Sequence, residues 1–195
     1  MGDNIMGAGR LQIKELLGPG GTTAMTIDDD GNITNSGHTT NTNLINFKMY
    51  MTGNFSCAQA SWKTLPIATA TNNNGGQTGW NIGSAWDTTN YRFYPQRAGY
   101  YHIGAQATLA ETNAAYILLS VLLNGYGTAG TGTELAIYAG VEGGQTNAWH
   151  YAFGSSVHYL SATDFISFRV YHNSGSAENV AGASSYTQAW GYQIA

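Results

Sequence analysis

Short segments in which every second residue is apolar recur from Phe47 to the end of the chain. The longest is residues 100–109, whose alternate apolar positions are Tyr101, Ile103, Ala105, Ala107 and Leu109. Two further segments behave alike and align Ile166, Phe168 and Val170 in one case, and Trp190, Tyr192 and Ile194 in the other. A period of two predicts strands with one face toward a core. Because Gly and Asn turns separate these segments and no strong amphipathic helix appears, we predict an all-β, antiparallel β-sandwich.

One of these strands, residues 116–123, is apolar on both faces. Ile117, Leu119 and Val121 share one face, and Tyr116, Leu118 and Leu122 share the other. A sandwich buries only one face of a strand, so the second face needs a cover of its own. We expect a neighbouring copy of the chain to supply it, with a covering loop of the same chain as the alternative. The predicted interface between copies consists of Tyr100, His102, Tyr116, Leu118, Leu122 and Tyr171.

Residues 1–45 have a different pattern and are predicted to form an N-terminal attachment arm, separate from a head at residues 46–195. Residues 11–17 fit two helical turns or an extended arm, since a segment this short does not hold a helix alone. Residues 22–34 alternate on both sides of the turn Asp28-Asp-Asp-Gly31, which predicts a hairpin. The segment cannot make a core, so we expect it to dock on a partner through Leu11, Ile13, Leu16 and Leu17.

The charge of the chain excludes several classes of partner. Charged residues make up 9% of the chain, and the net charge is −4. The 7 Lys and Arg residues are scattered singly, so the basic stripe of a nucleic-acid-binding protein is missing. The longest nearly apolar run, residues 114–123, is about half the roughly 20 residues of a membrane-spanning helix, so no membrane insertion is expected. Cys57 stands alone and the first residues lack an apolar signal core, which fits folding in a reducing cytoplasm.

A search for catalytic and metal-binding motifs predicts no enzyme, no metal and no cofactor. Residues 125–130 match G-x-G-x-x-G, but β-type residues follow where a dinucleotide site needs a helix, so we predict a glycine-rich hairpin loop. Asp28 and Asp30 lie in an aspartate-rich turn, but a calcium loop in that register would place Gly37 at the position of its final Glu. The 5 histidines lack the spacing of known metal-binding motifs. A metal bound on a three-fold axis by one His from each of three chains is therefore a hypothesis that no motif supports. Cys57 is expected to be a small buried apolar residue.

Two polar stretches that end in tryptophan, residues 71–80 and 141–149, are candidate binding loops. Asn and Gln side chains hydrogen-bond sugar hydroxyls, and Trp stacks on the apolar face of a sugar. The alternative is that they are ordinary solvated loops with a tucked-in Trp, and the sequence does not separate the two. The candidate glycan or receptor residues are Asn73, Gln77, Trp80, Gln145 and Trp149.

Residues 47–195 resemble the C1q-like globular domain, a member of the wider C1q/TNF jelly-roll group. Residues 86–103 are similar to the family's stretch of aromatic-Asp, a turn and Phe-x-x-Pro-x-x-Gly-x-Tyr-x-Phe, although Pro95 lies one position early and Ile103 replaces the last Phe. Three shorter stretches at residues 122–125, 160–166 and 184–192 resemble later family strands, in the same order. The resemblance implies a ten-stranded jelly roll, homotrimers, and binding through loops rather than catalysis.

Residues 22–34 resemble the Met-Thr-Ile-Asp-x-x-Gly-Asn-(Ile/Val)-Thr hairpins of bacteriophage tail-fibre and appendage proteins. Together the two resemblances predict a trimeric fibre or decoration protein of a virion, assembled in the host cytoplasm. The arm would bind capsid or tail proteins, and the outward head would bind host-surface glycan or only decorate the particle. The alternative is a soluble C1q/TNF-like cellular ligand or lectin, which predicts secretion and glycosylation at Asn54.

Overall fold

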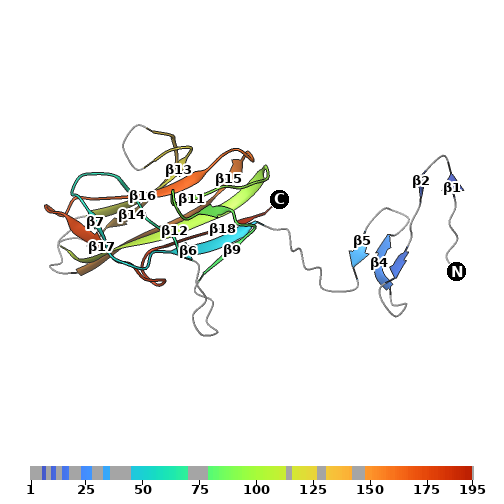
Figure 1. Cartoon of the computed structure of the whole chain (residues 1–195), viewed down its shortest axis with the longest axis horizontal. Helices are drawn as coiled ribbons and strands as arrows, with labels where there is room; N and C mark the ends of the chain where they lie inside the picture. The colour runs from blue at the N-terminus through green and yellow to red at the C-terminus, as the bar shows by residue number, and fades with distance from the viewer. Residues whose placement is uncertain are drawn as a thin grey trace. The chain divides into compact units, whose positions relative to one another are not determined.

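The computed structural model of the chain is all-β (Figure 1). It describes residues 6–7, 10–11, 15–17, 23–27, 33–35, 45–69, 79–112, 116–126, 131–141 and 148–194. The chain divides into two compact units, Met1–Thr42 and Asn43–Ala195. We call the second unit the head. No helix in the described ranges is long and apolar enough to cross a membrane.

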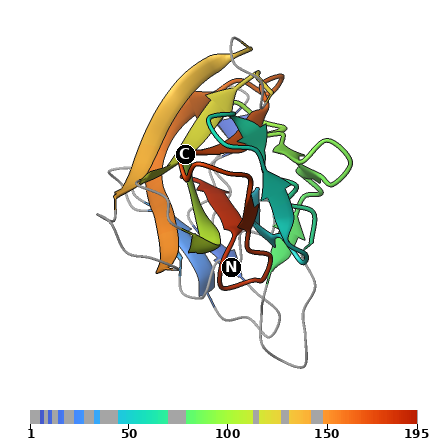
Figure 2. The same ribbon diagram turned by 90° about the vertical axis from the view of Figure 1, so that its left-hand side faces the viewer.

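The head is a sandwich of two antiparallel sheets (Figures 1 and 2). The six-stranded sheet has the order β10 (Trp86–Asp87), β11 (Arg92–Phe93), β16 (Ile166–His172), β13 (Tyr116–Leu123) and β14 (Thr133–Val141), with β8 (Lys63–Thr64) also paired to β16. The seven-stranded sheet has the order β7 (Phe55–Cys57), β17 (Glu178–Val180), β12 (Gly99–Thr112), β18 (Gln188–Gln193), β6 (Asn46–Tyr50) and β9 (Trp80–Ile82), with β15 (Ala148–Leu160) paired to β12.

The core lies between the two sheets and follows the predicted alternation. Every predicted inward residue of β12 is fully buried, as are Ile117, Leu119 and Val121 of β13. Rings fill the centre, where the Phe47 and Phe93 rings stack with centroids 4.6 Å apart. The polar group of the buried Trp86 ring is satisfied, because its indole N–H donates to the Ile67 carbonyl at 2.9 Å. The predicted sandwich and the inward-facing rows of β12, β13 and β16 are therefore confirmed. In β18 the row of Trp190 and Tyr192 faces outward instead, and the small residues Ala189 and Gly191 face the core.

The long strands β14 and β15 lie side by side and close one edge of the sandwich (Figure 2). Gly140 allows this close approach, because a Cβ atom there would lie 1.7 Å from the Tyr151 carbonyl oxygen. Strands β13 and β14 pair directly, so the predicted glycine-rich hairpin connects them. At its base Asn124 adopts a φ of 54°, which Asn tolerates better than most residues.

The N-terminal unit contains two small sheets. Strands β1 (Met6–Gly7) and β2 (Arg10–Leu11) pair, and β3 (Glu15–Leu17), β4 (Thr23–Ile27) and β5 (Ile33–Asn35) form the other sheet. The predicted hairpin is confirmed, with Thr26 opposite Thr34. Leu11, Leu16 and Leu17 are in strands, so the extended alternative holds there and the helical one does not. Ile13 lies outside the described residues.

Candidate functional site

The centre of the outer face of the six-stranded sheet is covered by the chain itself, although Ile137 of β14 on the same face is 49% exposed. Leu122 is only 1% exposed in a single copy, and Ser120 and Arg169 beside it are also buried. The Trp62 ring lies over the Arg169 guanidinium, with the ring centroid 4.2 Å from the guanidinium carbon. Trp62 also packs on Tyr171, at 5.4 Å between ring centroids. The segment before β8 therefore provides much of the cover.

Arg169 is a cation held against this face, and its charge is balanced within the chain. Its guanidinium donates to the Glu134 carboxylate at 2.9 Å and to the Ser120 hydroxyl at 3.3 Å. Partial burial alone would raise the pKa of Glu134, but the Ser120 hydroxyl and the Arg169 guanidinium together hold that pKa below its ordinary value. This cluster stabilises the cover and leaves no charge open to a ligand.

The predicted interface between copies does not form one surface. Tyr100 and His102 lie on β12 in the seven-stranded sheet, whereas Tyr116, Leu118 and Leu122 lie on β13 in the other sheet, with Tyr171 beside them on β16. The outer faces of two packed sheets point in opposite directions, so the two groups lie on separate surfaces of a single copy. Leu122 is 1% exposed in a single copy, so little of its surface is left for a partner to cover. The interface between copies stays a prediction for both groups of residues.

The outer face of the seven-stranded sheet is different, because large apolar side chains remain exposed on it. On β15 every second side chain points outward, and Phe153 is 69% and Tyr159 59% exposed. Tyr159 meets Tyr100 of β12 edge to face, with ring centroids 5.4 Å apart. We call this set the β12–β15 row; its members are Tyr100, Tyr151, Phe153, Val157 and Tyr159. Exposed apolar side chains gathered in this way mark a surface that binds a partner.

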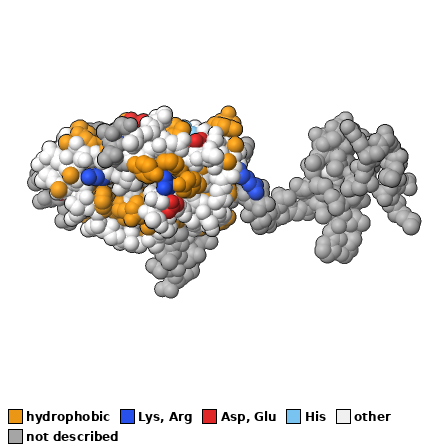
Figure 3. All heavy atoms as spheres, turned by 45° about the horizontal axis from the view of Figure 1, so that its top comes forward, with side chains coloured by type: hydrophobic (Ala, Val, Ile, Leu, Met, Phe, Trp, Pro, Cys, Tyr) orange, Lys and Arg blue, Asp and Glu red, His pale blue; other side chains and the backbone are white. Residues whose placement is uncertain are grey.

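Charged side chains are sparse on the head. Figure 3 shows one face of it, where hydrophobic side chains form several patches among mostly uncharged ones. On the outer face of the seven-stranded sheet, the His102 ring packs on Tyr192 at 5.2 Å between centroids, and its Nε2 lies 2.9 Å from the Ser155 hydroxyl. The centre of this face is therefore aromatic and uncharged polar, and it holds no described ion pair.

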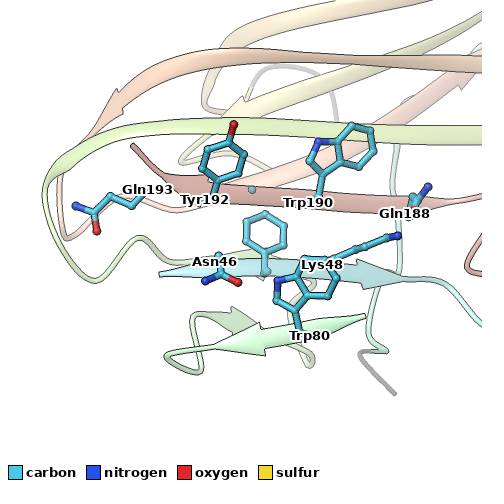
Figure 4. Close-up of a pocket in the computed structure, with 9 residues that line it drawn as sticks. Asn46, Lys48, Trp80, Gln188, Trp190, Tyr192 and Gln193 are labelled. Atoms are coloured by element: carbon cyan, nitrogen blue, oxygen red, sulfur yellow. The ribbon is translucent and has the colours of Figure 1, made fainter. Parts of the chain in front are cut away.

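A hollow of about 610 Å³ lies on the same outer face, over β6, β9 and β18 (Figure 4). Cross-strand register brings its residues together, because Lys48 lies opposite both Trp80 and Trp190, and Asn46 lies opposite Tyr192. The lining residues come from three strands and are Asn46, Phe47, Lys48, Trp80, Gln188, Trp190, Gly191, Tyr192 and Gln193. Aromatic walls with a few polar groups are typical of a ligand site.

Sequence reasoning found part of this hollow. Trp80 was predicted as a binding residue and does line the hollow, and the alignment of Trp190 with Tyr192 on one strand face is confirmed. Asn46, Lys48 and Gln188 were missed as site residues, although Asn46 and Lys48 alternate with the buried Phe47 and Met49. That alternation places them on an outward face, but it does not say which strands lie beside them.

The two predicted binding loops do not form one site. Trp80 is in β9, and Trp149 is in β15 with its ring 5.0 Å from that of Tyr186. Strands β12, β18 and β6 separate β15 from β9 in the sheet. Asn73, Gln77 and Gln145 lie outside the described residues.

The described residues contain no group of three or more His, Cys, Asp and Glu side chains that could hold a metal. His172 is buried, with Nε2 3.0 Å from the Cys57 carbonyl oxygen and Nδ1 2.9 Å from the Ser174 hydroxyl. The Cys57 side chain is fully buried, and burial raises the pKa of its thiol to about 11 despite the nearby Lys63. His158 lies 2.6 Å from the Ser156 hydroxyl, and desolvation lowers its pKa. These three side chains therefore make their contacts within the fold of the head.

The similarity of this chain to known proteins is a similarity of fold. Eiger TNF from S. frugiperda superposes with a TM-score of 0.56 at 12% identity, over 78% of this chain and 93% of that one. Murine APRIL at pH 8.5 superposes with a TM-score of 0.55 at 9% identity, over 77% of this chain and 99% of that one. No protein-family model matches the sequence, and no curated protein matches it. The head has a TNF-like jelly-roll fold.

Proposed function

We propose that this chain is a non-enzymatic structural and recognition protein of a virion, in which three heads associate and the N-terminal arm attaches them to the particle. The observation that carries the association is the β12–β15 row. A single copy leaves its aromatic side chains in water, whereas on the outer face of the other sheet it buries Leu122, Ser120 and Arg169. A row left uncovered on a chain that covers its other face is best explained by a partner.

A sister copy is the partner that this proposal names. The row lies beside β14 at the closed edge of the sandwich, and the hollow lies toward the other end of the same sheet face. Closed rings form when one copy presents one patch to a different patch of the next. The resemblance of residues 47–195 to the C1q-like domain supports a ring of three copies.

The oligomeric mass tests the association. We expect light scattering to report a trimer of the 20.8 kDa chain at micromolar concentration. Phe153→Asp places a charge in the row and should yield monomers with an unchanged β-type circular dichroism spectrum. Ala139→Asp, at an exposed position of β14, is the matched control and should stay trimeric. A monodisperse monomer of the unaltered chain would overturn the proposed association.

The attachment role is proposed for the N-terminal unit, residues 1–42. Its support is the β4–β5 hairpin, with its likeness to bacteriophage fibre hairpins, and its separation from the head as a compact unit. The partner would be a capsid or tail protein that contacts Leu11, Ile13, Leu16 and Leu17. Deleting residues 1–34 should leave a soluble trimeric head and abolish its incorporation into particles. Incorporation of the shortened chain would refute the anchor.

The fold likeness to Eiger TNF and APRIL favours a second candidate, a soluble C1q/TNF-like ligand or lectin of a cell. A secreted protein would carry a glycan at Asn54, which lies in the sequon Asn54-Phe-Ser56. The Asn54 side-chain oxygen accepts a hydrogen bond from the Gly182 N–H at 3.0 Å, so the side chain is already used in the fold. Intact mass after passage through a secretory pathway separates the candidates, since a glycan at Asn54 supports the cellular one.

A further inference from the structure

The hollow over β6, β9 and β18 has an aromatic wall whose position depends on a glycine of the neighbouring strand. Trp190 lies opposite Gly104 of β12, and a Cβ atom at Gly104 would lie 2.5 Å from the indole ring. The ring therefore rests against the backbone of β12 and is held there. Glycine in the interior of a long strand is unfavourable and often marks a close approach. Gly104 thus keeps the indole flat on the sheet, beside the hollow.

The polar groups of the hollow are placed for a ligand that has both hydroxyl and acidic groups. The Gln188 side-chain oxygen is buried and accepts no hydrogen bond within the described structure, so turning it toward the hollow to meet a ligand donor breaks no existing bond of that oxygen. The Lys48 ammonium lies 6.0 Å from the centroid of the Trp80 ring. Lys48 is the one charged residue among the described residues that line the hollow. The local charge is therefore positive, although the whole chain carries −4.

These features narrow the chemistry of the occupant. Indole rings stack on the apolar face of a pyranose, and amide side chains bind its hydroxyls. A neutral sugar would desolvate the Lys48 ammonium without replacing its water, which costs binding free energy. A sugar with a carboxylate would instead form a charge-assisted hydrogen bond with it. A neutral sugar would leave the Lys48 ammonium without a charged partner, so the hollow would bind a carboxylated sugar more tightly than a neutral one.

We infer that this hollow binds a carboxylated sugar, stacked on Trp80 and Trp190 with its carboxylate at Lys48 and a hydroxyl at the Gln188 oxygen. This inference rests on the proposed recognition role of the head and names the class of ligand. It places the recognition residues on the sheet face, whereas the sequence placed them in two loops. Of the described residues of those loops, Trp80 lines the hollow and Trp149 does not.

The test titrates the full chain with three methyl glycosides and follows tryptophan fluorescence and calorimetric heat. Methyl glucuronide and methyl N-acetylneuraminide are the acidic probes, and methyl glucoside is the neutral one. We expect at least one acidic probe to bind about tenfold or more tightly than methyl glucoside, a difference that one charge-assisted contact supplies. Lys48→Gln should remove this preference, and Trp190→Ala should remove binding of all three. Trp149→Ala, a tryptophan outside the hollow, is the matched control and should bind as the unaltered chain does.

Light scattering on every variant separates this inference from the proposed association. A trimer that binds neither acidic probe overturns the sugar site and leaves the association standing. Equal affinity for acidic and neutral probes overturns the role of Lys48 and with it the class of ligand. If Lys48→Gln or Trp190→Ala converts trimers to monomers, a second copy occupies the hollow and the inference is wrong. A monomeric chain that binds an acidic probe with the expected preference supports the sugar site and refutes the association.

Discussion

The ion pair between Arg169 and Glu134 gives a quantitative test of how the chain covers its own outer sheet face. The perturbation is Glu134→Gln, which keeps the size of the side chain and its contacts with Ser120 and Arg169 while removing the charge. Arg169 stays in place with an 8% exposed side chain and without its counter-charge. Removing one partner of a buried ion pair destabilises a fold more than removing one partner of a surface ion pair does.

The separation of the two groups sets the size of the effect. At 2.9 Å, Coulomb attraction amounts to about 6 kcal/mol at an effective dielectric constant of about 20 and about 1.4 kcal/mol in water. The Glu134 side chain is 35% exposed, so solvent screening brings the value toward the lower limit. We therefore expect Glu134→Gln to lower the free energy of unfolding by about 1–2 kcal/mol at pH 7.

The pH dependence fixes the origin of that loss. The pKa of Glu134 in the folded chain lies below its ordinary value, so the carboxylate stabilises the fold above its unfolded-state pKa of about 4.3. This contribution is lost as the pH falls through the folded-state pKa. The difference between the unaltered chain and Glu134→Gln should therefore be constant near neutral pH and vanish in acid.

Urea unfolding at fixed protein concentration, followed by circular dichroism from pH 7 downward, measures this difference. Glu178→Gln is the control, because the Glu178 carboxylate accepts a hydrogen bond from the Ser176 hydroxyl at 2.8 Å on an exposed part of the head. It should change the unfolding free energy by less than about 0.5 kcal/mol. A Glu134→Gln difference that persists unchanged in strong acid would refute the electrostatic explanation.

Three further predictions concern other parts of the head. Cys57, with a thiol pKa of about 11, should be about 0.1% thiolate at pH 8 and resist iodoacetamide until urea unfolds the chain, as intact mass will show; rapid native labelling would contradict its burial. Asn124→Ala should lower the free energy of unfolding by about 2–3 kcal/mol, because the Asn124 side chain donates to the Asp164 carboxylate at 2.8 Å and its backbone has a φ of 54°. Asn124→Gly loses the same hydrogen bond but tolerates this φ, so in the same urea titration its unfolding free energy should fall by about 1 kcal/mol less. Trp62→Ala should cost about 2–3 kcal/mol by uncovering Arg169, without changing the mass from light scattering; a changed mass would place this face at an interface.

The inward rows of the sandwich could be predicted from the sequence because they depend on local information. Alternation along a single strand marks two faces, and the fully buried Tyr101 and Ile103 show that the apolar face of residues 100–109 meets the core. The jelly-roll class followed from the number of such strands and from four short resemblances. Hairpins were equally accessible, because turn residues lie between their two strands.

The cover of residues 116–123 could not be predicted in this way. Periodicity shows that this strand has an apolar second face, but the groups that cover Arg169 on that face are Trp62 and Glu134, and Trp62 is far away in the sequence. The sequence alone therefore does not distinguish a cover by a loop of the same chain from a cover by a second copy. Arg169 in the segment at residues 166–172 was the available signal, because a cation within an apolar strand requires a partner nearby.

The hollow could not be predicted from the sequence for a related reason. Lys48, Trp80 and Trp190 come from three strands, and only the register of β9, β6 and β18 brings them together. Gly104 was a usable signal, since an isolated glycine inside a long alternating strand indicates that something packs closely on it. The signal marks a close approach, but the identity of Trp190 as its partner requires the sheet.

The two outer faces of the sandwich separate what this fold needs for stability from what it presents to a partner. A chain that buries Leu122 and packs its own tryptophan on Arg169 has a means of covering an apolar sheet face. The same chain leaves Phe153 and Tyr159 exposed, where a polar side chain would cost the monomer nothing in packing. Exposure of this kind is unfavourable for an isolated protomer in water, so it is explained by what the face binds. The function of the head is therefore to be sought on the seven-stranded sheet, and Phe153→Asp and Lys48→Gln divide that sheet into its assembly part and its recognition part.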